Sequence, residues 1–232
     1  MRRLEIRLLL TLLAVSATLT GFIHLTFEVR EGDTARFDRA VVLAFRLARD
    51  PGTAIGPRWV QESARDITAL GGFTVLTLIT GVAIAMLLMH GRRYQVMVFG
   101  GTVMVAQAAA ELLKHFVDRA RPMIVTQHDL VYSSSFPSGH AMMTPVVYLT
   151  LAAMLAAGDR RRGVKVLLFA GAAFLVIAVG VSRVYLGVHW PTDVVGGWTL
   201  GLAIALASAY VLHRTAPVRA AAEVKPDAPG AS

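Results

Sequence analysis

The stretch SRVYLGVHWPTD, residues 182–193, lies between two apolar runs, Val164 to Val181 and Val194 to Leu212. Each run is close to the ~20 residues that an α-helix needs to cross a hydrocarbon core about 30 Å thick. A short polar segment between two such runs predicts a pair of transmembrane helices with polar side chains at one membrane surface.

Four further apolar runs bring the predicted number of spans to six. They are Leu8 to Phe27, Ile67 to Met89, Tyr94 to Leu113 and Ala141 to Ala157. The first follows three arginines, as in a signal peptide, but no clear cleavage site of small residues ends it before Glu28, so we expect the chain to keep it. We therefore predict an all-α, polytopic membrane protein with six transmembrane helices.

The composition supports a bilayer environment and excludes several other classes of protein. Of 232 residues, 55% are hydrophobic and 16% are charged, and 23 Lys and Arg against 15 Asp and Glu give a net charge of +8. A basic soluble chain would favour nucleic acid as its partner, but a mean hydropathy of +0.58 favours a membrane and no nucleic-acid partner. The absence of cysteine excludes disulfides, thiolate metal sites and cysteine nucleophiles.

Two segments outside the spans differ in composition from the rest of the chain. Residues 28–66 hold seven acidic residues and seven arginines, and we expect this loop to contain a surface-lying amphipathic helix that ends before Asp50-Pro51-Gly52. The apolar positions of that helix are Phe37, Val41, Val42, Phe45 and Leu47. Residues 1–214 then form one membrane domain, and the Ala- and Pro-rich residues 215–232 are predicted to be a disordered tail.

Alternating spans place the connections after the third and fifth spans on the same side of the membrane, and these connections hold three polar clusters. The first contains Lys114 and Arg121, which would share a helix face if the third span continued two turns before Pro122 ends it. An arginine fork and a lysine point charge together suit a phosphate. The alternative is a pair of cations that extend to the membrane surface as anchors.

The second cluster is Phe136-Pro137-Ser138-Gly139-His140, directly before the fourth span. Ser138 is a good helix N-cap, and Gly139 lets a ligand approach the backbone closely. His140 would stand in the first helical turn, within reach of an anion bound there. A capped helix with an interfacial histidine is the simpler explanation, but it says little about why His140 is present.

The third cluster places Arg183, His189 and Asp193 within residues 182–193. Pro191 suits the first turn of the sixth span, which puts Asp193 near the third helical position. Asp193 could then accept a hydrogen bond from one ring nitrogen of His189 and leave the other as a nucleophile or general base. The alternative is a helix-start acid beside an interfacial histidine.

In this order, the patterns Lys-x6-Arg-Pro, Pro-Ser-Gly-His and Ser-Arg-x5-His-x3-Asp resemble the three-part signature of the type 2 phosphatidic acid phosphatase (PAP2) superfamily. That superfamily also includes vanadium haloperoxidases and glucose-6-phosphatases. The six spans match its integral-membrane branch and disfavour the soluble haloperoxidases. The resemblance implies a haloperoxidase-like helical core, hydrolysis of a lipid phosphate in the bilayer, and no metal or cofactor.

The resemblance also implies a role for each matching residue. His189 corresponds to the nucleophile that attacks phosphorus, Asp193 to the residue that orients it, and His140 to the general acid that protonates the leaving oxygen. Water would then hydrolyse a phosphohistidine. The residues that match the phosphate-binding positions are Lys114, Arg121, Ser138, Gly139 and Arg183.

The motifs recognise phosphate and do not choose the lipid. We expect undecaprenyl diphosphate, phosphatidylglycerophosphate or phosphatidate in a bacterial inner membrane, and the sequence is silent on oligomeric state. A lipid phosphotransferase would use the same residues, and a non-enzymatic anion transporter would need only an anion site of Arg and Lys. Glu111, inside the third span, is a functional candidate by position, although a structural pair with Lys114 or His115 is the simpler interpretation.

The distribution of lysine and arginine predicts the orientation in the membrane. Cations gather before the first span, between the second and third, between the fourth and fifth, and after the sixth. They are Arg2, Arg3, Arg7, Arg92, Arg93, Arg160, Arg161, Arg162, Lys165, Arg214, Arg219 and Lys225. Because cations in short loops mark the cytoplasmic side, we expect both termini in the cytoplasm and the three clusters in the periplasm.

Overall fold

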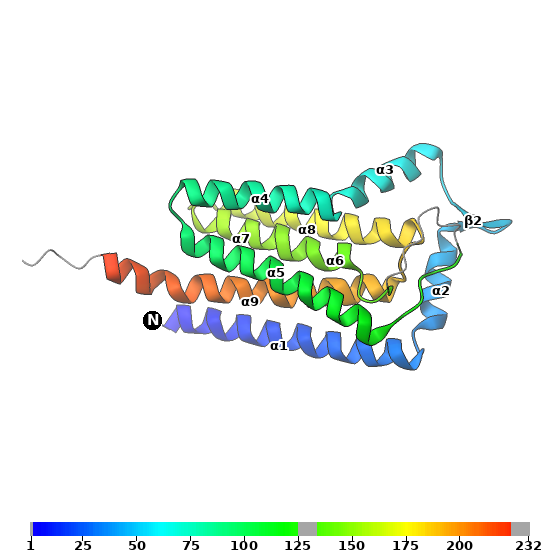
Figure 1. The fold of residues 1–232 in the computed structure, drawn as a ribbon, viewed down its shortest axis with the longest axis horizontal. Helices are drawn as coiled ribbons and strands as arrows, with labels where there is room; N and C mark the ends of the chain where they lie inside the picture. The colour runs from blue at the N-terminus through cyan, green and yellow to red at the C-terminus, as the bar shows by residue number, and fades with distance from the viewer. Residues whose placement is uncertain (1, 125–133, 224–232) are drawn as a thin grey trace, which may run out of the picture.

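The computed structural model describes residues 2–124 and 134–223, and this part of the chain is mostly helical (Figure 1). In chain order the elements are α1 (Arg2–Glu31), α2 (Ala35–Ala44), β1 (Arg46–Leu47), β2 (Asp50–Ala54), α3 (Arg58–Ala69), α4 (Phe73–Met89), α5 (Arg93–Val117), α6 (Gly139–Thr144), η1 (Pro145–Leu149), α7 (Thr150–Ala157), α8 (Arg162–Tyr185) and α9 (Pro191–Glu223). The element η1 is a π-helical turn that joins α6 to α7 within one span.

Five helical segments of the described chain are long and apolar enough to cross a membrane, and α3 with α4 makes a sixth span if the bent pair is counted as one. The five are α1, α5, the continuous run from α6 to α7, α8 and α9. These helices run side by side, and α2, α3 and the β hairpin gather at one end of the bundle (Figure 1). The predicted class, an all-α protein with multiple membrane spans, is confirmed.

The second predicted span, Ile67 to Met89, is wrong at its start. α3 ends at Ala69, and α4 begins at Phe73 with a bend of 43° between the two helices. A β-carbon on Gly71 would lie 2.5 Å from Cγ1 of Val179, so glycine is needed where this turn packs on α8. The bend carries α3 over the end of the bundle, where the polar clusters lie.

The amphipathic helix predicted within residues 28–66 forms only over α2, and Leu47 lies in the hairpin that follows. β1 and β2 of this hairpin pair in antiparallel fashion. Asp50 closes their turn, because its carboxylate accepts hydrogen bonds from the amide of Gly52 at 3.1 Å and from the hydroxyl of Thr53 at 2.6 Å. This local turn ends the helix earlier than the apolar spacing predicted.

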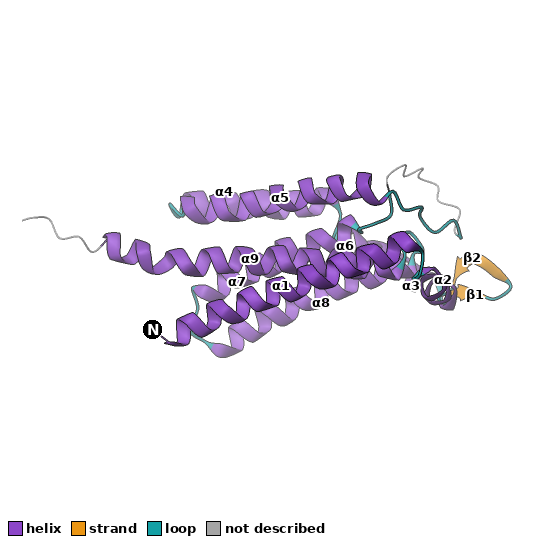
Figure 2. Ribbon diagram, turned by 90° about the horizontal axis from the view of Figure 1, so that it is seen from below, coloured by secondary structure: helices purple, strands orange, loops and turns teal. Residues whose placement is uncertain are grey.

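α9 lies at the centre of the packing and contacts α1, α5, α6, η1 and α8. A β-carbon on Gly201 would lie 2.3 Å from the carbonyl oxygen of Met142, so glycine permits α9 to approach α6 closely. α4 and α5 pack on each other and form a layer on one side of α9 (Figure 2). This arrangement positions the start of α6 against the start of α9.

The C-terminal tail is more helical than predicted. α9 continues to Glu223, nine residues into the segment that was expected to be disordered. Alanine has the highest helix propensity, and the added residues include Ala216, Ala220, Ala221 and Ala222. The rest of the predicted tail, residues 224–232, lies outside the described residues.

Candidate active site

The structure brings the three predicted clusters together at the end of the bundle that carries α2 and α3. The amide of Ser138 donates a hydrogen bond to the carbonyl oxygen of Asp193 at 3.0 Å. Nη1 of Arg121 lies 3.1 Å from Nε2 of His189. The connections after α5 and α8 therefore meet, as the alternation of the spans predicted.

Asp193 holds the ring of His189 in one orientation. Pro191 is the first residue of α9, as predicted, and Asp193 is the third. Oδ2 of Asp193 lies 3.5 Å from Nδ1 of His189, and it accepts hydrogen bonds from the amide of Trp190 at 2.8 Å and from the hydroxyl of Ser135. The side chains of His189 and Asp193 are 2% and 0% exposed. The ring therefore has little freedom to turn.

The protonation state of His189 follows from its neighbours. Burial lowers the pKa of His189 to about 4, although the hydrogen bond to Asp193 opposes the shift, so the ring is neutral at pH 7. A guanidinium has no acceptor, so the contact with Arg121 requires a lone pair on Nε2 and places the ring hydrogen on Nδ1 beside Asp193. A neutral imidazole with its lone pair held in a fixed direction is suited to act as a nucleophile or a general base.

Arg121 reaches this site from a loop. Lys114 and Arg121 do not share a helix face, because α5 ends at Val117 and Asp118 turns the chain in the left-handed conformation, with a φ of 42°. Nη1 of Arg121 also donates to the carbonyl oxygen of Val188 at 3.0 Å. Burial lowers the pKa of Arg121, but a guanidinium stays charged in proteins, so the site keeps this cation.

Ser138 and Arg183 each carry a buried polar atom suited to an oxyanion. Oγ of Ser138 and Nε of Arg183 have no hydrogen-bond partner among the described residues. Ser138 precedes α6, but its side chain does not cap the helix, contrary to the prediction. Nη1 of Arg183 donates to Oγ1 of Thr68 on α3 at 3.2 Å, which holds the guanidinium in place. Because buried polar groups in proteins are nearly always hydrogen-bonded, this hydroxyl and guanidinium fit a bound phosphate.

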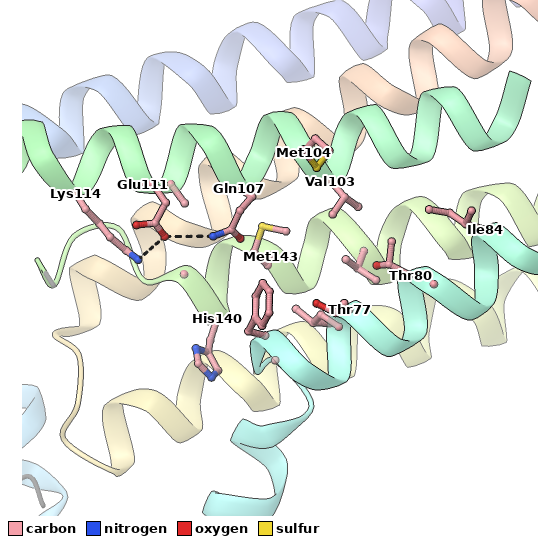
Figure 3. Close-up of a pocket in the computed structure, with 17 residues that line it drawn as sticks. Thr77, Thr80, Ile84, Val103, Met104, Gln107, Glu111, Lys114, His140 and Met143 are labelled. Atoms are coloured by element: carbon pink, nitrogen blue, oxygen red, sulfur yellow. Dashed lines mark hydrogen bonds and ion pairs between the residues drawn. The ribbon is translucent and has the colours of Figure 1, made fainter. Parts of the chain in front are cut away.

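Lys114, Gly139 and His140 line one cavity of about 620 Å³ between α4, α5 and α6 (Figure 3). Nζ of Lys114 would lie 4.0 Å from a β-carbon on Gly139, so the glycine keeps the backbone accessible beside this cation. The predicted pair of Lys114 with Glu111 is present, with Nζ 3.1 Å from Oε1. The groups within electrostatic range of His140 are Lys114, Arg121, Arg183 and His189.

Sequence reasoning missed several residues that support this arrangement, among them Ser135, Arg119 and Thr68. Ser135 and Arg119 both contact Asp193; the Nη1 of Arg119 lies 2.6 Å from Oδ1. Thr68 contacts Arg183 from α3. Ser135 and Arg119 lie one or two residues from predicted cluster members, and that closeness was the available signal. Thr68 is far from every cluster in the sequence, and no pattern pointed to it.

Comparison with known proteins shows to which family this sequence is similar. The family model of the PAP2 superfamily matches residues 95–216. Phosphatidylglycerophosphatase B of Bacillus subtilis is 30% identical over 192 residues, which cover 78% of this chain and 86% of that protein. Decaprenylphosphoryl-5-phosphoribose phosphatase of Mycobacterium tuberculosis is 34% identical over 149 residues, which cover 61% of this chain and 75% of that protein.

A solved structure shares the fold as well. It is the crystal structure of the first transmembrane PAP2 type phosphatidylglycerolphosphate phosphatase from Bacillus subtilis, which matches with a TM-score of 0.74 at 25% identity, over 92% of this chain and 98% of that chain. Fold and relatives together define a membrane lipid phosphatase with multiple spans. The chain belongs to the PAP2 superfamily.

Proposed function

We propose that the protein hydrolyses the phosphate of a membrane lipid through a phosphohistidine at Nε2 of His189. The observation that carries this proposal is the direction of that nitrogen, whose lone pair faces Arg121. Ser138 and Arg183 add buried polar atoms that lack partners among the described residues. A phosphate held by these groups would present phosphorus to a neutral nitrogen, and positioning of this kind is the main requirement of phosphoryl transfer.

In the first step, Nε2 of His189 bonds to phosphorus while the bond from phosphorus to the lipid oxygen breaks. His140 gives its proton to that leaving oxygen. The carboxylate of Asp193 stabilises the positive charge that develops on the ring of His189. The three cations that stabilise the charge on the equatorial oxygens are Lys114, Arg121 and Arg183.

In the second step, water attacks phosphorus, the bond to Nε2 breaks, His140 takes up a proton from the water, and phosphate leaves. The reaction therefore needs His189 neutral and His140 protonated at the start, which gives a bell-shaped pH profile. Side-chain cations and the backbone amide of Gly139 supply the charge stabilisation, so we expect the reaction to need no metal ion.

The proposed substrates are undecaprenyl diphosphate, phosphatidylglycerophosphate and phosphatidate. The cavity that begins at His140 supports a lipid, because most of the residues that line it are apolar. The names of the two relatives, which refer to phosphatidylglycerophosphate and to a decaprenylphosphoryl phosphoribose, support the same class.

The proposed orientation places the site at the outer face of a bacterial cytoplasmic membrane and both termini in the cytoplasm. It is supported by Arg92 and Arg93 at the start of α5 and by Arg160 to Arg162 at the start of α8, where short connections lie at the other end of the bundle. Alkaline phosphatase fused after Met123 should be active, and the same reporter fused after Arg161 should be inactive. The reverse pattern would overturn the orientation and leave the chemistry unchanged.

Release of inorganic phosphate by the purified protein in detergent tests the proposed reaction. We expect turnover of at least one of the three lipids, activity that survives EDTA, and loss to background in His189→Ala. Arg161→Gln, in an exposed ion pair at the other end of the bundle, is the control and should keep full activity. Full activity in His189→Ala, or loss in EDTA that Mg²⁺ restores, would contradict the mechanism. Transfer of the phosphate to an acceptor lipid without phosphate release would identify a phosphotransferase.

A further inference from the structure

A second cavity lies at the end of the bundle opposite to the proposed active site. Its volume is about 650 Å³, and its lining residues come from α4, from α7 and from the turn that leads into α5. That turn lies at the far end of the bundle from α2 and α3 (Figure 1). This cavity shares no lining residue with the cavity that begins at His140.

The lining of the second cavity is polar at one end and apolar along the rest. Its three polar residues are His90, Arg92 and Gln95, which lie close together where α4 is followed by α5. All other residues that line it are aliphatic or methionine, and no acid is among the lining residues in the described part of the chain. The wall that α4 forms extends about 18 Å from Leu78 to His90, at 1.5 Å per residue. The cavity therefore has one cationic end and a long apolar part.

The turn after α4 fixes the backbone at the cationic end. Gly91 has a φ of 67°, and the amide of Arg92 donates a hydrogen bond to the carbonyl oxygen of Leu87 at 2.8 Å, as at many helix ends. Nδ1 of His90 lies 2.7 Å from the carbonyl oxygen of Met86. Because a carbonyl oxygen only accepts, the ring hydrogen is on Nδ1, and Nε2 is left to contact a ligand.

We propose that the second cavity binds one anionic phospholipid, with its phosphate at Arg92 and His90 and one acyl chain along α4. The charge of the cavity favours an anion, because a guanidinium donates two parallel hydrogen bonds to a phosphate and no lining acid competes for it. The apolar part favours a lipid over free phosphate, since an acyl chain gains free energy when it is buried against aliphatic side chains. This site is separate from the proposed reaction centre and does not depend on which lipid is hydrolysed.

A lipid in the second cavity would stabilise a helix that the protein itself packs weakly. Leu76 is the one buried residue of α4. Thr77 and Ile84, on another face of α4, line the cavity that begins at His140. An acyl chain between α4 and α7 would add contacts that the side chains there do not make. Bound lipid should therefore raise the stability of the fold and support one wall of the proposed active site.

Thermal unfolding of the purified protein in detergent tests this inference without any use of phosphatase activity. The probes are dioleoyl phosphatidylglycerol, which is anionic, dioleoyl phosphatidylcholine, which has the same chains and no net charge, and inorganic phosphate. We expect phosphatidylglycerol at about ten times its Kd to raise Tm by about 3–6 °C. Phosphatidylcholine should raise it much less, and equal rises with the two lipids would overturn the inference.

Arg92→Gln and Arg93→Gln form a matched pair, because they remove the same charge from adjacent residues and only Arg92 lines the cavity. Arg92→Gln should need roughly 10-fold more phosphatidylglycerol for half of the Tm rise, since a hydrogen bond to a charged group is lost. Arg93→Gln should respond as the wild type does. Equal responses of the two variants would show general attraction between cations and anionic lipid and would overturn the site. A Tm rise with inorganic phosphate that Arg92→Gln removes would also overturn it, in favour of a phosphate site.

Val82→Trp tests the apolar part of the cavity independently. Val82 lines the cavity and is 60% exposed, so a tryptophan there should occupy the space of the acyl chain without a clash in the core. It should abolish the Tm rise with phosphatidylglycerol, measured against the lipid-free Tm of the same variant. Val105→Trp, at a position on α5 that is 62% exposed and lines neither cavity, is the control and should keep the rise. A full rise in Val82→Trp would overturn the inference and leave the proposed function standing.

Discussion

The two sides of the proposed reaction centre are built differently. On the nucleophile side, His189 and Asp193 are buried, and both carboxylate oxygens of Asp193 accept hydrogen bonds. On the leaving-group side, His140 opens on a cavity of about 620 Å³ between helices. The first side fixes one geometry, whereas the second leaves room for a lipid.

The fixed side extends well beyond the histidine and its carboxylate. Arg119 donates from Nη1 to Asp193 and from Nη2 to Asp38, each at 2.6 Å. Asp38 is 1% exposed and also accepts hydrogen bonds from the hydroxyl of Thr192 at 2.7 Å and from its amide at 3.0 Å. In this way α2, from the loop after the first span, holds the start of α9 and, through it, His189.

This difference follows from what each side has to do. In-line attack tolerates little displacement, since an error of about 1 Å can cost roughly 10²-fold in rate. Removal of one partner of a buried ion pair also strongly reduces stability, because the other charge is left uncompensated. Substitutions on the fixed side should therefore reduce the rate for every substrate, and substitutions on the open side should depend on the leaving group.

The largest effect expected to separate the two sides comes from His140→Ala. General acid catalysis is worth about 10²- to 10⁴-fold, and it matters little for a leaving group that departs as a stable anion. We expect a loss of that size in kcat/KM, which reports formation of the phosphohistidine, on a lipid phosphate and a much smaller loss in kcat/KM on p-nitrophenyl phosphate. Equal losses on both substrates would show that His140 acts on something other than the leaving oxygen.

Arg119→Gln should have the next largest effect, on the fixed side. We expect kcat to fall roughly 10- to 100-fold, the range known for hydrogen-bond partners of metal-ligating histidines, because Arg119 likewise holds the carboxylate beside His189. KM should change little, because Arg119 contacts Asp193 and not the proposed phosphate groups. A rise in KM with kcat unchanged would instead place Arg119 in substrate binding.

The pH profile of the same variant sharpens this test. Burial lowers the pKa of His189 to about 4, so the neutral ring, and with it kcat/KM, should be lost as the pH falls through that value. Loss of the Arg119 cation favours the protonated ring, so the acid limb should move to higher pH. Asp38→Asn removes a negative charge beside Arg119, which disfavours the protonated ring of His189, so the acid limb should move to lower pH. Shifts of the acid limb in the same direction in both variants would mean that Arg119 and Asp38 act through structure alone. The other charged or titratable groups that face His189 are unchanged in both variants, and they are Asp193, Arg121, Arg183 and His140.

A smaller effect on stability is expected where α6 packs on α9. A β-carbon on Gly197 would lie 2.7 Å from the carbonyl oxygen of Ser138 and 2.9 Å from Cβ of Ala141. Gly197→Ala should therefore destabilise the fold by about 1–3 kcal/mol and lower Tm in detergent. Gly101→Ala is the matched control, since nothing lies within 4 Å of its added carbon. Equal Tm values for the two variants would show that α6 and α9 can shift apart at no cost.

The sequence was sufficient to predict side-chain contacts where a few neighbouring residues decide the geometry. Asp193 faces His189 because His189 lies just before α9 and Asp193 lies in its first turn, and the spacing alone predicted their contact. Arg119 and Asp38 lie 81 positions apart, and their pairing depends on how α2 folds over the bundle. The break at Gly71 was missed for a similar reason, because the apolar run continues through it and packing against α8 decides where the helix ends.

The covalent intermediate on His189 is the central claim, and trapping it is the most direct test. Wild-type protein mixed with substrate labelled in the reacting phosphate should retain label after an alkaline quench and lose it in acid, as a phosphorus–nitrogen bond requires. The label should map to the peptide that contains His189 and be absent in His189→Ala. A label that is stable in acid and labile in base, or one that persists in His189→Ala, would contradict the mechanism.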